Sequence, residues 1–153
     1  MSKAATLVVI QFVLLGLEAV ALLLLPKGGT DITRVVGVAM SVLGLLVALY
    51  AIYEHQRANR QLPNVVPIPK ETGGLITSGL YRWVRHPIYT GVLLGAFGIA
   101  VFQWHIVTAL LAIALYGLFS VKSRYEESLL KIAFPEYAAY MTRTGRFFPG
   151  INL

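Results

Sequence analysis

The sequence predicts an all-α integral membrane protein with four transmembrane helices, both termini in the cytoplasm, a hairpin of helices three and four, and a folded-back amphipathic C-terminal tail. Three observations predict this fold. First, 57% of the residues are hydrophobic and only 13% are charged, whereas about 25% of the residues of a soluble domain are charged. Second, the apolar residues gather in four runs. Third, the basic residues lie almost entirely at one end of these runs. Residues 1–153 suit a single domain.

The four apolar runs cover about residues 7–25, 32–53, 87–102 and 106–121. The first has the roughly 20 residues that a bilayer requires. A signal peptide is the alternative for this run, because Lys3 precedes it, but no small-x-small cleavage pattern follows. Only the tripeptide "QWH" separates the third and fourth runs, which predicts a tight hairpin. Both of these runs are short, so we expect their helices to extend beyond the apolar core.

Basic residues set the expected orientation. Eleven of the 13 Lys and Arg residues precede the first run, lie between the second and third, or follow the fourth; the exceptions are Lys27 and Arg34. The positive-inside rule therefore predicts that the 54–86 loop and both termini face the cytoplasm.

Composition also excludes several classes of partner and site. The net charge of +6 is explained by orientation in the membrane and by anionic lipids, without a nucleic-acid partner. The absence of cysteine excludes a disulfide framework, a cysteine nucleophile and thiolate metal sites. His55 and His105 have no partners at metal-ligand spacing, so we expect no metal.

The residues before the third run carry the unusual chemistry. Residues 61–74 contain three prolines and predict an extended, non-helical crossing. Pro87 suits the first turn of a helix, so Arg85 and His86 lie at its entrance. The free N–H groups of that helix end favour an anionic ligand group.

An amphipathic tail follows the fourth run. Pro135 predicts the start of a short helix that stops at Gly145. Tyr137 and Tyr140 share one face of it, with Met141, and this face either covers a pocket or lies on the membrane surface. Upstream, the adjacent residues Glu126 and Glu127 lie about 100° apart on a helix and cannot share one face.

Two signals within the apolar runs have alternative explanations. Glu18 lies in the middle of the first run, where a carboxylate is either functional or a protonated packing residue. Gly91, Gly95 and Gly98 place small residues on roughly one helix face, which favours close helix packing or a cofactor against bare backbone.

The motifs form an ordered set that is more specific than its parts. It reads "LITSGLYRWVRHPIYTG", then an apolar hairpin, then "RYEESLLKIAFPEYAAYMTRTGRFFP". This set resembles the isoprenylcysteine carboxyl methyltransferase family, together with the related phospholipid N-methyltransferases and bacterial methyltransferase-like membrane proteins. The resemblance covers about residues 63–149. Pro135 departs from the pattern, since many relatives have glycine after the Phe.

The resemblance implies a bacterial or archaeal inner-membrane enzyme that uses S-adenosylmethionine at the cytoplasmic face. The cofactor-binding region would cover about residues 75–98 and 122–149. The implied cofactor-binding residues are Tyr81, Arg85, His86, Pro87, Tyr89, Gly91, Gly95, Tyr137 and Tyr140. The implied catalytic residues are Glu127, Arg146 and Glu126. The basic helix entrance would hold the carboxylate end of the cofactor, and the glycines would admit its adenosine.

The methyl acceptor stays open. A carboxylate acceptor needs no base, and Arg146 or Arg143 would orient it. A thiol or amine acceptor must lose a proton, which Glu127 or Glu126 would accept. We expect a small or lipidic acceptor that enters from the bilayer.

Two other functions fit parts of the pattern. One is a membrane reductase of the sterol-reductase type, which binds NADPH. The other is a membrane assembly subunit without enzyme activity, which retains the packing glycines but has no need of the R-H-P and E-E motifs together. A homo-oligomer formed through the glycines of the third run also fits the sequence.

Overall fold

The helices of the protein account for most of the chain. The computed structural model describes residues 3–65 and 74–151, and within these ranges the regular elements are all helical apart from isolated β-bridges. The elements are α1 (Lys3–Leu24), α2 (Asp31–Asn59), a 3₁₀ turn (Gly79–Arg82), α3 (Pro87–Gln103), α4 (Ile106–Ala133) and α5 (Tyr137–Arg143). Among the described residues, α1, α2 and α4 are long and apolar enough to cross a membrane, and α3 is a shorter apolar helix. Many large apolar side chains on these helices are exposed, as expected of surfaces that face lipid. The predicted all-α membrane fold is confirmed.

The hairpin of α3 and α4 has sharp ends. Trp104 adopts a left-handed conformation at the end of α3, and its N–H donates to the carbonyl of Ala100. His105 begins α4, because its Nδ1 accepts a hydrogen bond from the N–H of Val107 at 3.1 Å. The tight hairpin and the extension of α4 past the apolar run are therefore confirmed.

The expected extension of α3 is wrong. The helix has 17 residues and begins at Pro87, so it is about 26 Å long. Residues 84–86 do not continue it, because their backbone pairs with the tail. The N–H of Arg85 donates to the carbonyl of Gly145 at 2.9 Å, and that of His86 donates to the carbonyl of Arg146 at 3.1 Å.

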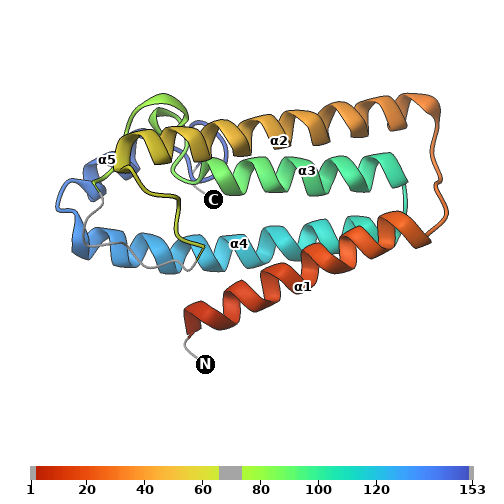
Figure 1. Cartoon of the computed structure of the whole chain (residues 1–153), viewed down its shortest axis with the longest axis horizontal. Coiled ribbons are helices and arrows are strands. Elements are labelled where there is room, and N and C mark those ends of the chain that lie inside the picture. The colour runs from red at the N-terminus through yellow and green to blue at the C-terminus, as the bar shows by residue number, and fades with distance from the viewer. Residues whose placement is uncertain (1–2, 66–73, 152–153) are drawn as a thin grey trace.

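Glycines bring α2 and α3 into direct backbone contact along their length (Figure 1). A Cβ atom on Gly91 would lie 2.5 Å from the carbonyl oxygen of Gly44, and one on Gly98 would lie 2.7 Å from the backbone nitrogen of Ser41. The packing explanation of Gly91 and Gly98 is confirmed, and Gly44 packs on the facing helix. Such small-residue contacts replace the hydrophobic driving force that helices lack inside lipid.

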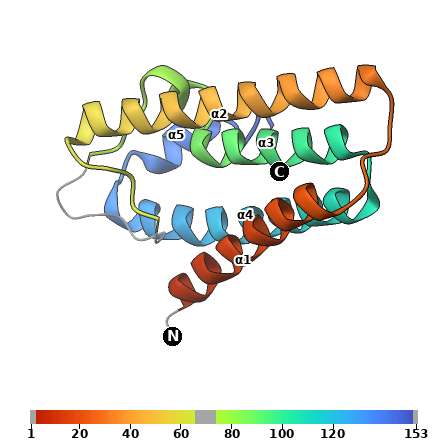
Figure 2. The same cartoon turned by 45° about the vertical axis from the view of Figure 1, so that its right-hand side comes forward.

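Helix α1 lies against α4 and crosses it obliquely (Figure 2). Lys122 of α4 is buried and donates to the amide oxygen of Gln11 at 2.5 Å. Glu18 is buried as well, and its Oε1 has no hydrogen-bond partner within the described residues. Its side chain belongs to the packed interior, while a functional role for it stays a prediction.

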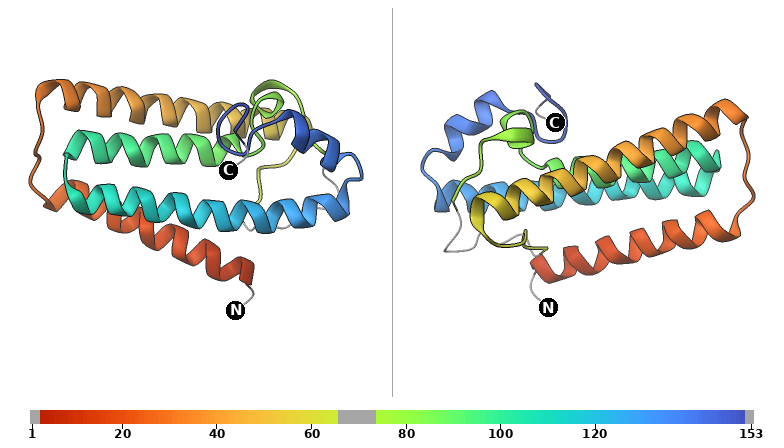
Figure 3. Two further views of the ribbon diagram at one scale, coloured as in Figure 1. Left: turned by 180° about the vertical axis from the view of Figure 1, so that it is seen from behind. Right: turned by 45° about the horizontal axis from the view of Figure 1, so that its top comes forward.

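The 3₁₀ turn, α5 and the tail that follows gather at one end of the bundle, where α2 and α4 end and α3 begins (Figure 3). The tail folds back over this end, as predicted, and α5 begins at Tyr137, two residues after Pro135. Residues 61–65 are non-helical, as expected, whereas residues 66–73 of the predicted crossing lie outside the described residues.

Candidate active site

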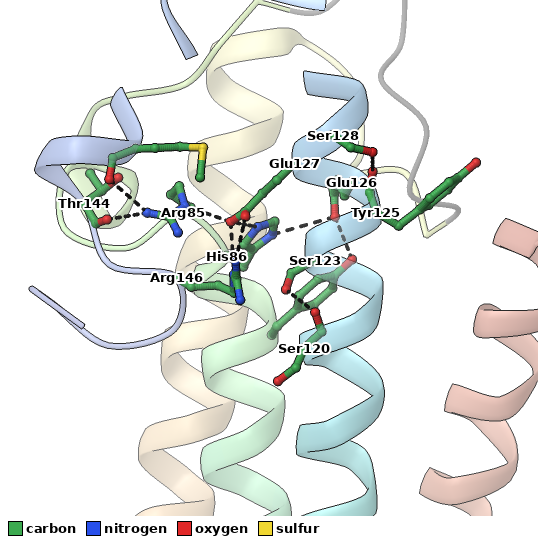
Figure 4. Close-up of polar contacts among 12 residues, drawn as sticks. Arg85, His86, Ser120, Ser123, Tyr125, Glu126, Glu127, Ser128, Thr144 and Arg146 are labelled. Atoms are coloured by element: carbon green, nitrogen blue, oxygen red, sulfur yellow. Dashed lines mark hydrogen bonds and ion pairs between the residues drawn. The ribbon is translucent and has the colours of Figure 1, made fainter. Parts of the chain in front are cut away.

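A buried ionic cluster joins the entrance of α3 to α4 and the tail. Arg85 donates from Nε to Oε1 of Glu127 at 2.8 Å, and Arg146 donates from a terminal guanidinium nitrogen to Oε2 at 3.0 Å (Figure 4). His86 adds a contact from Nε2 to Oε1 at 3.2 Å. The exposed fractions of the Arg85, His86 and Glu127 side chains are 1%, 5% and 4%. Two guanidinium groups therefore hold Glu127 in its carboxylate form, despite its burial. We call Arg85, Glu127 and Arg146 the clamp.

The clamp also binds the tail backbone. The Arg85 guanidinium donates to the carbonyl of Met141 at 3.2 Å and to the carbonyl of Thr144. Tail residues 145–147 run beside residues 84–90, and the hydroxyl of Thr90 donates to the carbonyl of Phe147 at 2.8 Å. The tail is thus held both by the Arg85 guanidinium and by hydrogen bonds from the backbone of residues 85–86.

The second carboxylate faces a different set of groups. Glu126 accepts a hydrogen bond at Oε2 from the hydroxyl of Tyr89 at 3.0 Å, and the same oxygen lies 3.7 Å from Nδ1 of His86. Although Glu126 and Glu127 lie about 100° apart on α4, both reach His86, because its two ring nitrogens point to opposite sides. The His86 ring also stacks on Tyr89, at 5.3 Å between centroids.

Three tyrosines surround this end of α3. The hydroxyl of Tyr140 donates to the carbonyl of Tyr81 at 2.5 Å, which joins α5 to the 3₁₀ turn. Burial raises the pKa of the Tyr140 phenol to about 12. Burial, together with nearby carboxylates, also raises the pKa of Tyr81 and of Tyr137. All three phenols are therefore neutral near pH 7.

The hydroxyl of Tyr137 differs from that of Tyr140. It is fully buried and has no hydrogen-bond partner within the described residues. A buried hydroxyl without a partner loses the hydrogen bonds it made in water. Tyr137 also lines a pocket, although its hydroxyl oxygen has almost no exposed surface.

The pocket lies between the motif residues and the end of α2. The motif residues that line it are Leu75, Ile76, Tyr81, Arg85, His86, Pro87, Ile88, Tyr89, Glu126, Leu130, Phe134, Tyr137 and Tyr140. The other lining residues are His55, Asn59, Gln61, Pro63, Asn64 and Gly74. Seven of the nine predicted cofactor-binding residues therefore share one pocket wall.

The remaining predicted residues lie elsewhere. Gly91 faces α2, and neither Gly91 nor Gly95 is among the residues that line the pocket. Glu127 and Arg146 lie behind the pocket wall, in the clamp. Of the two carboxylates, Glu126 is the one that the pocket exposes to a ligand.

Sequence reasoning missed a carboxylate on α2. Glu54 accepts a hydrogen bond at Oε2 from the N–H of Leu80 at 2.8 Å. Gly79, just before it, has a φ of +56°, and a Cβ there would lie 1.2 Å from a Glu54 oxygen. Glu54 therefore fixes the 3₁₀ turn that carries Tyr81. An isolated acidic residue at the end of a hydrophobic helix was the available signal.

No group of three or more His, Cys, Asp or Glu residues in residues 3–65 and 74–151 is arranged to hold a metal ion. The donors at the site are instead carboxylates already bound to guanidinium, imidazole and phenol groups.

Comparisons with known proteins identify relatives of this chain. The chain is 41% identical over 85 residues to the cobalt-zinc-cadmium resistance protein CzcN of Cupriavidus metallidurans. The aligned residues cover 55% of this chain and 39% of that protein. The chain is also 30% identical over 119 residues to protein-S-isoprenylcysteine O-methyltransferase B of Arabidopsis thaliana, and the aligned residues cover 76% of this chain and 59% of that protein. A probable protein-S-isoprenylcysteine O-methyltransferase of Oryza sativa subsp. indica is 33% identical over 120 residues, 76% of this chain and 61% of that protein.

The chain thus spans about two fifths of CzcN and about three fifths of the plant proteins. Residues 32–137 match the family described as phospholipid methyltransferase. The match contains α2, the entrance of α3, the hairpin and both glutamates of α4. The chain belongs to the phospholipid methyltransferase family.

Proposed function

We propose that this protein is an integral membrane methyltransferase that uses S-adenosylmethionine and methylates a small or lipidic acceptor. The pocket itself carries the proposal, because seven of the nine predicted cofactor-binding residues line it together with the carboxylate of Glu126. The family and the plant relatives support methyl transfer as the reaction.

The residues present fit this cofactor. Glu126 offers carboxylate oxygens to ribose hydroxyls or to an ammonium group. The rings of Tyr81, Tyr137 and Tyr140 suit a sulfonium cation and an adenine ring. Ile88 brings the N-terminal end of α3 to the pocket, and the positive end of a helix dipole favours a carboxylate. Arg85 would contribute charge there, although Glu127 already neutralises part of it.

When bound, S-adenosylmethionine supplies an electrophilic methyl group on a positively charged sulfur. The task of the chain is then to align the acceptor and to exclude water. Helix α5 closes one side of the pocket, and Arg85 of the clamp binds its end through the carbonyl of Met141. Glu127 and Arg146 act as positioning residues in this proposal, through the tail.

Glu126 is the residue that we assign to the proton of the acceptor. A thiol or amine must lose a proton, and Glu126 is the pocket-facing carboxylate next to His86 and Tyr89. A carboxylate acceptor needs no such step. An acceptor whose methylation requires Glu126 even at a saturating cofactor concentration therefore belongs to the thiol or amine class.

We further propose that α1, α2, α3 and α4 all span the bilayer, with both termini and the site in the cytoplasm of a bacterial or archaeal cell. Helix α3 is apolar and packs along α2 through backbone contacts, which supports its position in the membrane beside a longer span. The distribution of basic residues supports the orientation.

Calorimetry on the detergent-purified protein tests the cofactor. We expect saturable binding of S-adenosylmethionine that the double variant Arg85→Ala, His86→Ala loses. Glu126→Gln keeps the size of the side chain, removes the carboxylate charge from the pocket and should weaken binding about 5- to 10-fold, as the loss of one hydrogen bond predicts. The matched control is Glu136→Gln, at an exposed position.

Unchanged affinity in Glu126→Gln would contradict a role for the pocket carboxylate in binding the cofactor. Binding of NADPH in place of S-adenosylmethionine would favour the reductase alternative. No binding of either by folded protein would favour the assembly-subunit alternative. If S-adenosylmethionine binds, a labelled methyl group then identifies the acceptor among isoprenylated cysteine, ethanolamine lipid and small thiol compounds.

A further inference from the structure

The C-terminal tail extends from the polar end of the bundle into its apolar part. Phe147 is 2% exposed and belongs to the apolar core between α3 and α4. Its ring lies 6.0 Å from that of Tyr116, and its carbonyl accepts the hydroxyl of Thr90. Thr90 lies three residues into α3 and Tyr116 five residues before the end of the 106–121 run. Phe147 therefore lies about 5–8 Å inside the apolar part of the bundle.

A tight turn follows at this depth. The N–H of Ile151 donates to the carbonyl of Phe148 at 3.2 Å, and Pro149 and Gly150 occupy the two central positions. Gly150, the third residue of the turn, has a φ of +72°, which is the positive φ that a type II turn requires there. The N–H of Arg146 donates to the carbonyl of Ile151 at 3.1 Å, so the chain reverses directly beyond Phe147. These hydrogen bonds satisfy backbone N–H and C=O groups, whose burial in an apolar environment without partners would cost free energy.

The side chains of this turn point outward and are apolar. Phe148 is 42% exposed and Ile151 is 46% exposed. Trp83, whose carbonyl accepts the N–H of Gly145 at the start of the same tail segment, is 57% exposed. Trp is the residue type most characteristic of the boundary between headgroups and acyl chains. The turn and Trp83 thus lie at the end of the bundle where that boundary is expected.

We propose that the turn 148–151 inserts into the bilayer at the boundary between headgroups and acyl chains, with Phe148 and Ile151 against the first methylene groups of the lipid. The partner of this surface is bilayer lipid. The proposal rests on the membrane arrangement proposed above. Since Arg146 lies two residues before the turn and its N–H donates to the carbonyl of Ile151, insertion also fixes the arginine that completes the clamp on Glu127.

Because the chain has no cysteine, single cysteines can report the depth of each position. The reporters are Phe148→Cys and Ile151→Cys, each carrying a nitroxide in vesicles of phosphatidylethanolamine and phosphatidylglycerol. Leu45→Cys, on an exposed apolar position of α2, is the lipid control, and Thr142→Cys, exposed on α5, is the water control. Size-exclusion chromatography verifies that each variant is folded.

We expect collisions with oxygen to exceed collisions with a water-soluble nickel chelate at positions 148 and 151, as at position 45. The order should reverse at position 142. A water-like result at positions 148 and 151, with a lipid-like result at 45, overturns the insertion and leaves the membrane arrangement intact. A water-like result at 45 as well overturns both.

Discussion

Arg85 and Glu127 form a buried ion pair, 2.8 Å between Nε and Oε1, across 42 positions of sequence. One residue lies at the entrance of α3 and the other on α4, while Arg146 of the tail binds the second carboxylate oxygen. The pair is therefore the point at which three segments of the site are fixed relative to one another.

Replacement of Glu127 by Gln should destabilise the folded state by about 3 kcal/mol, because two buried guanidinium groups lose their counter-charge. Chemical unfolding in detergent measures this, and faster proteolysis within the tail should accompany it. The matched control is Glu126→Gln, whose side chain is 26% exposed and whose contact with Tyr89 survives as a neutral hydrogen bond, so a loss of about 1 kcal/mol or less is expected. Equal losses in the two variants would contradict the separate roles of the two carboxylates.

Replacement of Gly79 by Ala should displace the Glu54 carboxylate and strain the 3₁₀ turn. A left-handed backbone costs a residue with a Cβ about 1–2 kcal/mol, and the Glu54 oxygen occupies the space for that Cβ. We expect a loss of stability and at least tenfold weaker cofactor binding, because Tyr81 shifts. Glu54→Gln retains an acceptor for the N–H of Leu80 and should bind nearly as wild type, whereas Glu54→Leu should resemble Gly79→Ala. Wild-type cofactor binding by Glu54→Leu would show that the 3₁₀ turn keeps its conformation without Glu54.

Gly91→Ala should destabilise the contact of α2 with α3, since the new Cβ meets backbone atoms of Gly44 and Ala48. Overpacking of this kind costs about 1–3 kcal/mol. Gly117→Ala on α4 is the control, because nothing lies within 4 Å of its Cβ position, and Ala is favoured over Gly in helices by about 1 kcal/mol. Thermal unfolding should separate the variants in opposite directions. A neutral Gly91→Ala would mean that the two helices are not in close contact.

Alkaline pH should weaken the folded state through the tyrosines of the site. The pKa of Tyr140 is raised from an ordinary value near 10 to about 12. A group with a raised pKa contributes stability that is complete below pH 10 and is lost as the pH rises toward 12. In Tyr140→Phe, stability should be lower near pH 8, because the bond to the Tyr81 carbonyl is gone, and should fall less steeply between pH 10 and 12. Parallel curves for the two proteins would show that Tyr140 does not titrate in this range.

Much of the fold follows from local sequence. Apolar runs of spanning length predict membrane helices whatever their neighbours are, because lipid forces the backbone to satisfy itself within each helix. Pro87 and the short "QWH" link likewise define the start of α3 and the hairpin. The motif residues that share the pocket wall were predicted from the order of the motifs.

Other features depend on how the helices are rotated and on where the tail lies. The short third apolar run implied a helix that extends beyond it. The backbone of residues 84–86 pairs with the tail instead, so α3 begins at Pro87. The sequence allowed Gly91 either a packing or a cofactor-binding role, and the rotation of α3 directs it to α2.

The sequence by itself determined the membrane helices, the hairpin and the identity of the motif residues, because these depend on hydropathy and on local backbone chemistry. Only the tertiary structure decided that Glu127 binds Arg85 and Arg146 while its neighbour Glu126 faces the pocket. The physical reason is that adjacent residues on a helix point in different directions. What each of them meets is set by segments tens of residues away.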